Sequence, residues 1–337
     1  MDSQTNNSKD PERLTYCEGI LQAFRYLLSN YPNTFTIGQG LWSPWYVGAS
    51  MSNLEKEFGH ERVIDTPVSE AACTGIAIGA SLLGYRPIVI HPRLDFMLLA
   101  ADQIVNQAAK WSSMFGGEHS PAVTFRAIIN RGGEQGAQHS QALHSWFAHI
   151  PGLRVVMPAT ALDARDLLIA SVLSNDPVLY IDDRWLYESE DQFVPLREIN
   201  LRTVEPRIVK SGVDITLVGC SYSTSLAGKA SEILEQSGIN SEVIDIRVLN
   251  PLKPQVIIDS VKKTGRLCVI DGGWRHCGLA GEIIATTLES ISPALLKCSP
   301  IRVTLPDSPA PTSSALEKNY YTSPENIAVA VLKLFEA

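Results

Sequence analysis

The sequence contains little charge and no long apolar run. Asp, Glu, Lys and Arg make up 19% of its 337 residues, and 28 basic against 36 acidic residues give a formal net charge of −8. A chain with this balance lacks the basic face that a general nucleic-acid binder needs to neutralise phosphates. No segment approaches the roughly 18 consecutive apolar residues of a membrane-spanning helix. Composition therefore argues against both a nucleic-acid partner and a membrane protein.

Several familiar motifs are also missing. The six cysteines form no CxxC pair, so we expect free buried thiols in a reducing, cytoplasmic compartment. No His and Cys cluster has the spacing of a zinc site, and we expect no metal ligands on this chain. The phosphate-loop patterns GxGxxG and GxxxxGK(S/T) and the serine-hydrolase pattern GxSxG are absent. The polar segment 1–13 lacks the apolar centre of a signal peptide, which predicts a disordered lead-in.

Short apolar strands alternate with helical patterns along the chain. In the first half we expect strands at 35–37, 62–65, 85–90, 122–129, 154–157 and 178–182, and helices that include 71–83, 95–115 and 162–173. The alternation restarts with strands at 214–218, 242–247, 267–271 and 301–305. Strands joined by long helices favour parallel pairing. The sequence therefore predicts an α/β fold of two domains, 14–190 and 209–337, whose mainly parallel sheets are flanked by helices and joined by a linker at 191–208.

Two segments carry polar residues where chemistry is expected. In TPVSE, Glu70 stands where a strand ends and a helix begins, and the carboxyl ends of parallel strands are where open α/β sheets bind ligands. A glutamate in the first helical turn also stabilises the helix by itself, which is the structural alternative. In RGGEQGAQHSQ, residues 131–141, three glycines allow sharp turns and His139 can exchange a proton near neutral pH. A surface turn with an incidental histidine is the alternative there.

Taken in order, the segments resemble a known family. The similarity is to the beta subunit of the thiamine-diphosphate-dependent dehydrogenase component of 2-oxoacid dehydrogenase complexes, and to the related split transketolases. It is carried by TPVSE, GYRPIVI, DFMLLAADQIVNQAAKW, GGEQGAQHSQALHSWFAHIPGLRVVMPAT and DPVLYIDDRWLY, and later by SEVIDIRVLNPL, TGRLCVIDGGW and PDSPAPTSSALEKNYY. It covers roughly residues 14–335. The resemblance implies a pyrimidine-binding domain followed by a transketolase C-terminal domain.

The resemblance also implies roles for single residues. Glu70 matches the carboxylate that hydrogen-bonds the aminopyrimidine ring of thiamine diphosphate, and Phe96 matches an aromatic position at the same pocket. Gln103 is a weaker candidate for that pocket. His139 matches the active-site histidine, placed to assist proton transfer or to hold the substrate. The implied reaction cleaves a 2-oxo acid or a ketose next to its carbonyl and transfers the acyl or ketol fragment to an acceptor.

The family divides its cofactor site between two chains. Its alpha subunit binds the diphosphate through Mg²⁺ with a GDG…N motif, and this sequence contains no GDG. The resemblance therefore implies an alpha partner that holds most of the metal site, in an α2β2 assembly with active sites at the interfaces. A lipoyl or acyl carrier protein is a further possible partner. The low charge content agrees with a large surface buried against other chains.

Three positions depart from the family pattern. Gln39 stands where many relatives have an acid, and Arg93 lies in a segment that is usually apolar and aromatic. His144 stands where many dehydrogenase subunits have Glu or another residue. Arg93 and His144 are candidates for contact with the substrate, Arg93 for an anionic or phosphorylated group, although a salt bridge fits Arg93 equally well. These departures favour a split transketolase or a biosynthetic acyl or ketol transferase. A catalytically silent structural or regulatory subunit is the alternative, and retention of Glu70 and His139 argues against it.

Overall fold

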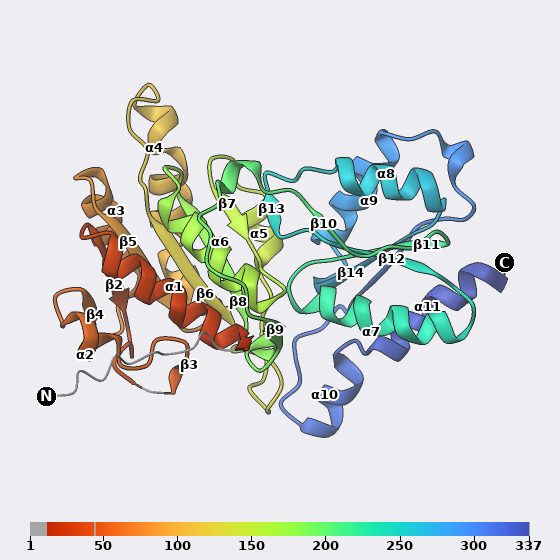
Figure 1. Ribbon diagram of the computed structural model, residues 1–337, viewed down its shortest axis with the longest axis horizontal. Coiled ribbons are helices and arrows are strands. Elements are labelled where there is room, and N and C mark those ends of the chain that lie inside the picture. The colour runs from red at the N-terminus through yellow and green to blue at the C-terminus, as the bar shows by residue number, and fades with distance from the viewer. Residues whose placement is uncertain (1–11, 44, 337) are drawn as a thin grey trace, which may run out of the picture.

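Two α/β units stand side by side in the computed structural model (Figure 1). The structure describes residues 12–43 and 45–336. Most of the expected lead-in 1–13 thus lies outside the described residues, and Arg13 already begins strand β1 (Arg13–Thr15), which pairs with β9 (Glu190–Gln192). Within the described ranges, no helix has both the length and the apolar character that a membrane crossing requires.

The first unit is built on a seven-stranded sheet in the order β13-β7-β8-β6-β5-β2-β4. Its strands are β2 (Thr34–Gly38), β4 (Val63–Asp65), β5 (Arg86–His91), β6 (Thr124–Ile129), β7 (Arg154–Val156), β8 (Val178–Asp183) and β13 (Val248–Asn250). All neighbouring strands are parallel except β13 and β7. Strands β6 and β8 are buried along their whole length, as a parallel sheet covered on both faces requires.

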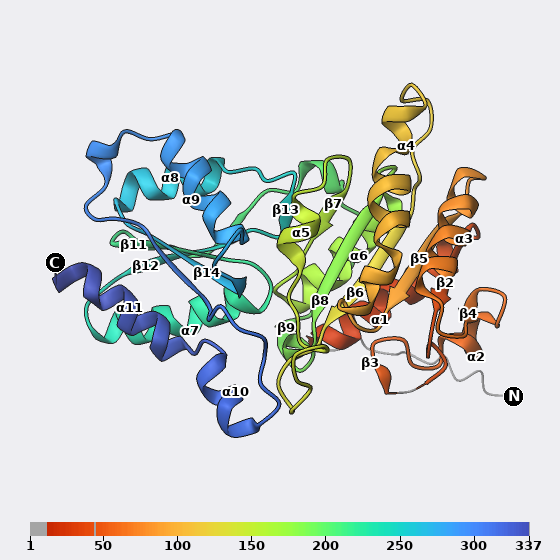
Figure 2. The same ribbon diagram turned by 180° about the vertical axis from the view of Figure 1, so that it is seen from behind.

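Helices cover both faces of this sheet (Figures 1 and 2). On one face α1 (Tyr16–Asn30) packs along α6 (Ala161–Leu173), and on the other lie α3 (Glu70–Leu82) and α4 (Ala109–Met114). Helix α1 begins where Thr15 and Glu18 cap each other's backbone N–H groups. Shorter elements complete the unit: β3 (Tyr46–Ala49), α2 (Leu54–Phe58), α5 (His144–Ala148) and η3 (Arg184–Leu186).

The second unit has a five-stranded sheet in the order β10-β12-β11-β14-β15. Its strands are β10 (Arg207–Lys210), β11 (Ile215–Gly219), β12 (Ser241–Asp245), β14 (Leu267–Trp274) and β15 (Ile301–Leu305), and only β10 is antiparallel. Helices α7 (Tyr222–Gln236) and α11 (Pro324–Glu336) cover one face, and α8 (Gln255–Thr264) and α9 (Leu279–Glu289) the other (Figure 1). The remaining elements are η4 (Leu201–Thr203), η5 (Pro293–Leu295) and α10 (Ser314–Tyr320). The predicted two-domain α/β fold is confirmed.

One expected helix differs in its winding. The segment 95–115 consists of a 3₁₀ turn, η1 (Phe96–Ala100), a π-helical stretch, η2 (Gln103–Ala108), and α4. An apolar pattern indicates which face of a segment is buried, but it does not determine which carbonyl each N–H group bonds, so it cannot distinguish these windings. The short elements β3, β9, β10, β13, α5 and α10 were also not expected.

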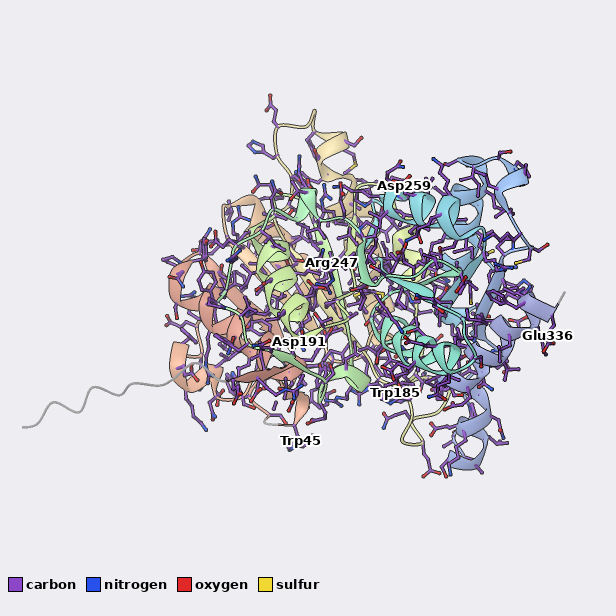
Figure 3. The ribbon with its side chains drawn as sticks, turned by 45° about the vertical axis from the view of Figure 1, so that its right-hand side comes forward. Trp45, Trp185, Asp191, Arg247, Asp259 and Glu336 are labelled. Atoms are coloured by element: carbon purple, nitrogen blue, oxygen red, sulfur yellow. The ribbon has the colours of Figure 1, made fainter. Side chains whose placement is uncertain are left out.

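The two units share an apolar core. A single buried cluster includes Phe125 and Leu179 of the first sheet and Val218, Ile244 and Leu279 of the second unit. Strand β13 comes from sequence beyond the expected linker and yet pairs with β7 of the first sheet. Figure 3 shows Arg247 and Trp185 where the two units meet. The units therefore pack as one body rather than as domains joined only by a linker.

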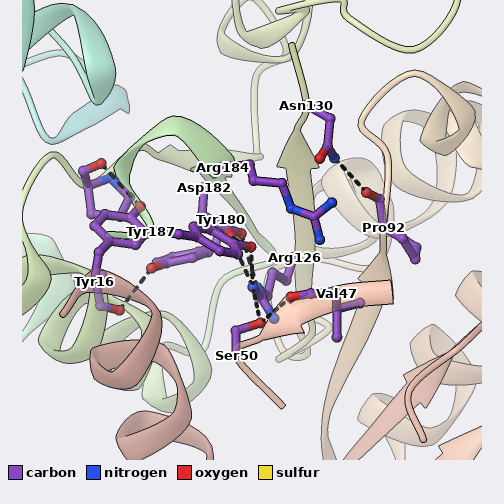
Figure 4. A network of polar contacts seen from close by, with 12 residues as sticks. Tyr16, Val47, Ser50, Pro92, Arg126, Asn130, Tyr180, Asp182, Arg184 and Tyr187 are labelled. Atoms are coloured by element: carbon purple, nitrogen blue, oxygen red, sulfur yellow. Dashed lines mark hydrogen bonds and ion pairs between the residues drawn. The ribbon is translucent and has the colours of Figure 1, made fainter. Parts of the chain in front are cut away.

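A buried ion pair fixes the centre of the first sheet (Figure 4). Nε and Nη2 of Arg126, on β6, donate to the two carboxylate oxygens of Asp182, on β8, at 3.0 and 2.9 Å. The same Nη2 reaches Ser50 Oγ at 2.9 Å, and the Tyr187 hydroxyl donates to Asp182 at 2.6 Å. Burial alone would lower the pKa of the Arg126 guanidinium, but the Asp182 carboxylate raises it above its ordinary value.

Removing the Asp182 carboxylate should destabilise the whole first unit. We expect Asp182→Ala to lower the free energy of unfolding by about 3–5 kcal/mol, because the buried Arg126 charge would lose its partner. Urea unfolding followed by circular dichroism measures this. Arg25→Ala is the matched control, since the Arg25–Glu57 pair is partly exposed and should contribute less than about 1 kcal/mol. Equal losses in the two variants would contradict the expectation.

Candidate active site

A small pocket opens at the carboxyl ends of three neighbouring strands. After β2 it is lined by Gln39, after β4 by Thr66 and Glu70, and after β5 by Arg93 and Phe96. Because β4, β2 and β5 are parallel, their ends meet at one edge of the sheet, which is the usual ligand position in an open α/β fold. The pocket thus lies at the edge of the sheet where the sequence analysis expects Glu70.

Glu70 is the first residue of α3 and is half-buried. The turn before it is fixed by two contacts: the Thr66 N–H donates to the Gly38 carbonyl at 2.9 Å, and Cys73 Sγ lies 3.3 Å from Thr66 Oγ1. Within the part of the chain that the structure describes, the Glu70 carboxylate makes no hydrogen bond or ion pair. A carboxylate held on a pocket wall without a partner is available to bind a ligand.

His139 lies beside the pocket through its contact with Phe96. The two rings meet edge to face, with centroids 5.2 Å apart and an angle of 81° between their planes. Asp95, next to Phe96, accepts a hydrogen bond from the Gln141 N–H at 3.0 Å, which joins the two segments again. The structure therefore brings Glu70 and Phe96 into one pocket and places His139 against it.

The segment that carries His139 is held by the second unit. We call residues 130–143, between β6 and α5, the His139 loop. The Glu134 N–H donates to both carboxylate oxygens of Glu317, on α10, at 3.1 and 3.2 Å, and the Glu134 carboxylate accepts the Ser314 N–H at 3.1 Å. Gly136 has a φ of +73°, and a Cβ there would lie 2.7 Å from the Thr312 hydroxyl oxygen. Helix α10 and the chain before it thus fix the middle of the loop.

Besides His139, two predicted site residues lie outside the lining of this pocket. Gln103, on η2, faces α3: its Cγ is 3.8 Å from where a Cβ on Gly75 would stand, and its buried Oε1 has no hydrogen-bond partner among the described residues. His144 is only 1% exposed, and its Nε2 lies 2.9 Å from Asp271 Oδ1 of β14. This burial between the two units favours a structural role for His144 over the substrate contact expected from the sequence.

Asp271 supports that structural role. Burial alone would raise the pKa of its carboxyl group, but His144 and the N–H groups of Gly273 and Ala280, which donate at 2.8 and 3.2 Å, hold the pKa below its ordinary value. The carboxylate therefore stays charged although it is buried. It accepts hydrogen bonds from both units and joins the end of the His139 loop to β14.

Sequence reasoning did not single out His91, which also lines the pocket. His91 is the last residue of β5 and is 2% exposed, and its Nε2 lies 3.4 Å from Thr74 Oγ1. Burial lowers the pKa of His91 to about 4, so its ring is neutral at pH 7. The position at a strand end, the same signal that pointed to Glu70, was available for His91 as well.

Loss of the Glu317 carboxylate should loosen the His139 loop. In Glu317→Ala we expect amide hydrogen exchange of residues 132–138 to accelerate about tenfold or more, because a hydrogen bond to a charged group contributes roughly 1.5–3 kcal/mol. Mass spectrometry of peptic fragments measures this. Glu325→Gln, at an exposed glutamate of α11, is the control and should leave the hydrogen exchange of the His139 loop unchanged. Unchanged exchange in Glu317→Ala would show that other contacts hold the loop.

The fold and the site define a class of protein: two packed α/β units, with a ligand pocket at the strand ends of the first and a histidine loop anchored on the second. The sequence comparisons agree with this class. Residues 12–189 match the transketolase pyrimidine-binding domain, and residues 205–327 match the transketolase C-terminal domain.

Individual similar proteins define the family more specifically than the domain matches do. The chain is 40% identical to the beta subunit of acetoin:2,6-dichlorophenolindophenol oxidoreductase from Cupriavidus necator, over 81% of this chain and 80% of that one. It is 38% identical to the pyruvate dehydrogenase E1 component subunit beta of Rhizobium meliloti, over 79% of this chain and 57% of that longer one. A solved split gene transketolase, an inactive beta4 tetramer, shares the fold with a TM-score of 0.77 at 22% identity, over 95% of this chain and 98% of that chain. The chain therefore belongs to the beta subunits of the thiamine-diphosphate-dependent 2-oxoacid dehydrogenase family, whose members act with an alpha partner.

Proposed function

We propose that this chain supplies the pyrimidine half of a thiamine-diphosphate site. The observation that carries the proposal is the unpaired Glu70 carboxylate on a pocket wall that also contains Phe96. Glu70 would hydrogen-bond the aminopyrimidine ring nitrogen, and Phe96 would pack against that ring. A half-buried carboxylate beside an aromatic side chain fits such a ring. When bound, thiamine diphosphate supplies an electron sink for breaking the bond next to a substrate carbonyl.

His139 is the proposed proton carrier or substrate anchor. It lies against Phe96 on a loop with many contacts, so its ring would be held beside the reacting group without rearrangement. An imidazole is suited to exchanging a proton with a carbonyl or hydroxyl group near neutral pH. Gln103 stays a weaker candidate, because it does not line the pocket and its Cγ lies against α3.

The diphosphate and Mg²⁺ are proposed to be held by the alpha subunit, in an α2β2 assembly. Support comes from the missing GDG motif and from exposed apolar side chains just before Glu70 and along the helix α3 that it begins: Val68, Ile76 and Leu83 are 73%, 61% and 81% exposed. Apolar groups this exposed beside a site are typical of a surface that a partner covers. An alpha subunit seated there would close the pocket over the cofactor.

The proposed reaction is cleavage of a 2-oxo acid or a ketose next to its carbonyl, with transfer of the fragment to an acceptor. The acceptor is a lipoyl or acyl carrier protein or a small aldehyde. We place the enzyme in the cytoplasm. All six cysteines are unpaired, in agreement with a reducing compartment, although Cys277 is exposed rather than buried as expected.

Glu70→Gln tests the role of the carboxylate. We expect turnover by the complex with the alpha subunit to fall by at least about a hundredfold, because general acid–base groups contribute roughly 10²–10⁴-fold. The yield of complex should not change. Glu61→Gln, at an exposed glutamate of the same unit, is the control.

The divided cofactor site predicts a second result: calorimetry should show weak binding of thiamine diphosphate to this chain alone. Near-normal turnover of Glu70→Gln, or tight binding by the lone chain, would refute the proposal.

His139→Ala tests the histidine. We expect turnover to fall by more than about tenfold and the pH profile to lose one limb, because the group that exchanges the proton would be absent. His119→Ala, at an exposed histidine after α4, should behave as wild type. Steady-state kinetics between pH 5.5 and 8.5 provide the measurement. A profile that keeps both limbs would exclude proton transfer by His139.

A further inference from the structure

Arg93 lines the Glu70 pocket, and the fold leaves its guanidinium almost without partners. Its Nη1 donates to the Pro92 carbonyl at 3.0 Å, and its buried Nε has no hydrogen-bond partner among the described residues. Within the same part of the chain, no carboxylate forms an ion pair with Arg93. Arg62 makes the contrast: it donates to three backbone carbonyls, those of Leu28, Tyr31 and Thr34, at 3.1, 3.1 and 2.6 Å.

A second guanidinium lies close by. Arg184, from η3 at the end of β8, donates through Nη2 to the Tyr46 carbonyl at 3.2 Å. The hydroxyl of Tyr46 accepts a hydrogen bond at 2.8 Å from Gln39, which lines the same pocket. Figure 4 shows Arg184 extending toward the segment that carries Pro92, the neighbour of Arg93. Arg184 is therefore not part of the pocket lining, but its positive charge acts on Arg93.

The surrounding charges do not neutralise the end of the pocket at Arg93. Burial lowers the pKa of Arg93, and the positive charge of Arg184 lowers it further. Asp95 acts in the opposite direction, but its Oδ1 accepts the Gln141 N–H and it forms no ion pair with either arginine in the described structure. Arginines with free donors are suited to bind planar carboxylates and phosphates. An oxyanion at this end would remove both the repulsion and the unpaired donors.

We propose that Arg93, with added positive charge from Arg184, binds an oxyanion of the substrate that is not changed in the reaction, a phosphate or a carboxylate remote from the reacting carbonyl. This inference rests on the proposed function and names its substrate class. A carboxylate that is lost as CO₂ is a poor occupant, because pairing it with arginines would stabilise the ground state against the transition state. A remote anion keeps its contacts throughout the reaction and positions the carbonyl near Glu70 and His139.

Kinetics of the complex with the alpha subunit test this with matched substrate pairs. One arm compares 2-oxoglutarate with 2-oxopentanoate, and the other compares a ketose phosphate with the free ketose. In Arg93→Gln we expect kcat/KM for the member of the preferred arm that carries the remote anion to fall at least about tenfold more than kcat/KM for the member that lacks it. Arg93→Lys should recover part of the loss. Arg275→Gln, at an exposed arginine with no ion pair in the described structure, is the control.

Equal effects on substrates with and without the remote anion would overturn the inference. A lower yield of complex in Arg93→Gln would overturn it too, since Arg93 would then pair with the alpha subunit. Chemical labelling separates this inference from the proposed function. Inorganic phosphate or malonate should protect Arg93 in the complex from phenylglyoxal, as mapped by mass spectrometry, whether or not turnover is found. Absence of protection by both anions would contradict the oxyanion site, whereas protection without turnover would contradict only the proposed reaction.

Discussion

Arg131 joins the His139 loop to both units of the molecule. At the start of the loop its guanidinium pairs with Asp183, at the end of β8, and donates to the Gly272 carbonyl of β14 at 3.1 Å. It also lies 5.2 Å from the centre of the Trp185 ring. Burial opposes the charge of Arg131, but Asp183 raises the pKa of the guanidinium above its ordinary value. Because a buried charge is costly without its partner, this contact strongly restricts where the loop begins.

The other end of the loop is fixed in a similar way. His144 begins α5 and contacts Asp271, so both ends of the loop are joined to β14 of the second unit, while Glu317 holds the middle. In the described structure, all residues lining the Glu70 pocket belong to the first unit. The second unit thus contributes no wall to this pocket and yet determines where His139 lies. The shared apolar cluster makes the arrangement rigid, because its side chains pack across the border between the units.

The sequence predicts the sheets better than the contacts between them. Strands such as β6 and β8 are mostly apolar segments of the sequence, and parallel pairing follows from the helices that separate them. Glu70 could be found because a strand end before a helix marks the ligand edge. The role of His144 could not be found in this way, because its partner Asp271 is 127 residues away and no local sequence pattern indicates such a pair. The same holds for Glu134 and Glu317, and for the windings of η1 and η2.

The pairing of charges distinguishes scaffold from site. Arg126 and Arg131 are buried and each is paired with a carboxylate, although Nη1 of Arg126 and Nε of Arg131 lack a hydrogen-bond partner among the described residues. Arg62 is bonded to backbone carbonyls, so the contacts of all three side chains hold the fold. Glu70 and Arg93 differ, because the described structure gives the first no partner and the second only the neighbouring carbonyl. Leaving polar groups unpaired in a pocket costs stability, which packing elsewhere must offset. A ligand that brings a hydrogen-bond donor to Glu70 and an anion to Arg93 removes that cost, so the fold itself favours a bound molecule with both groups.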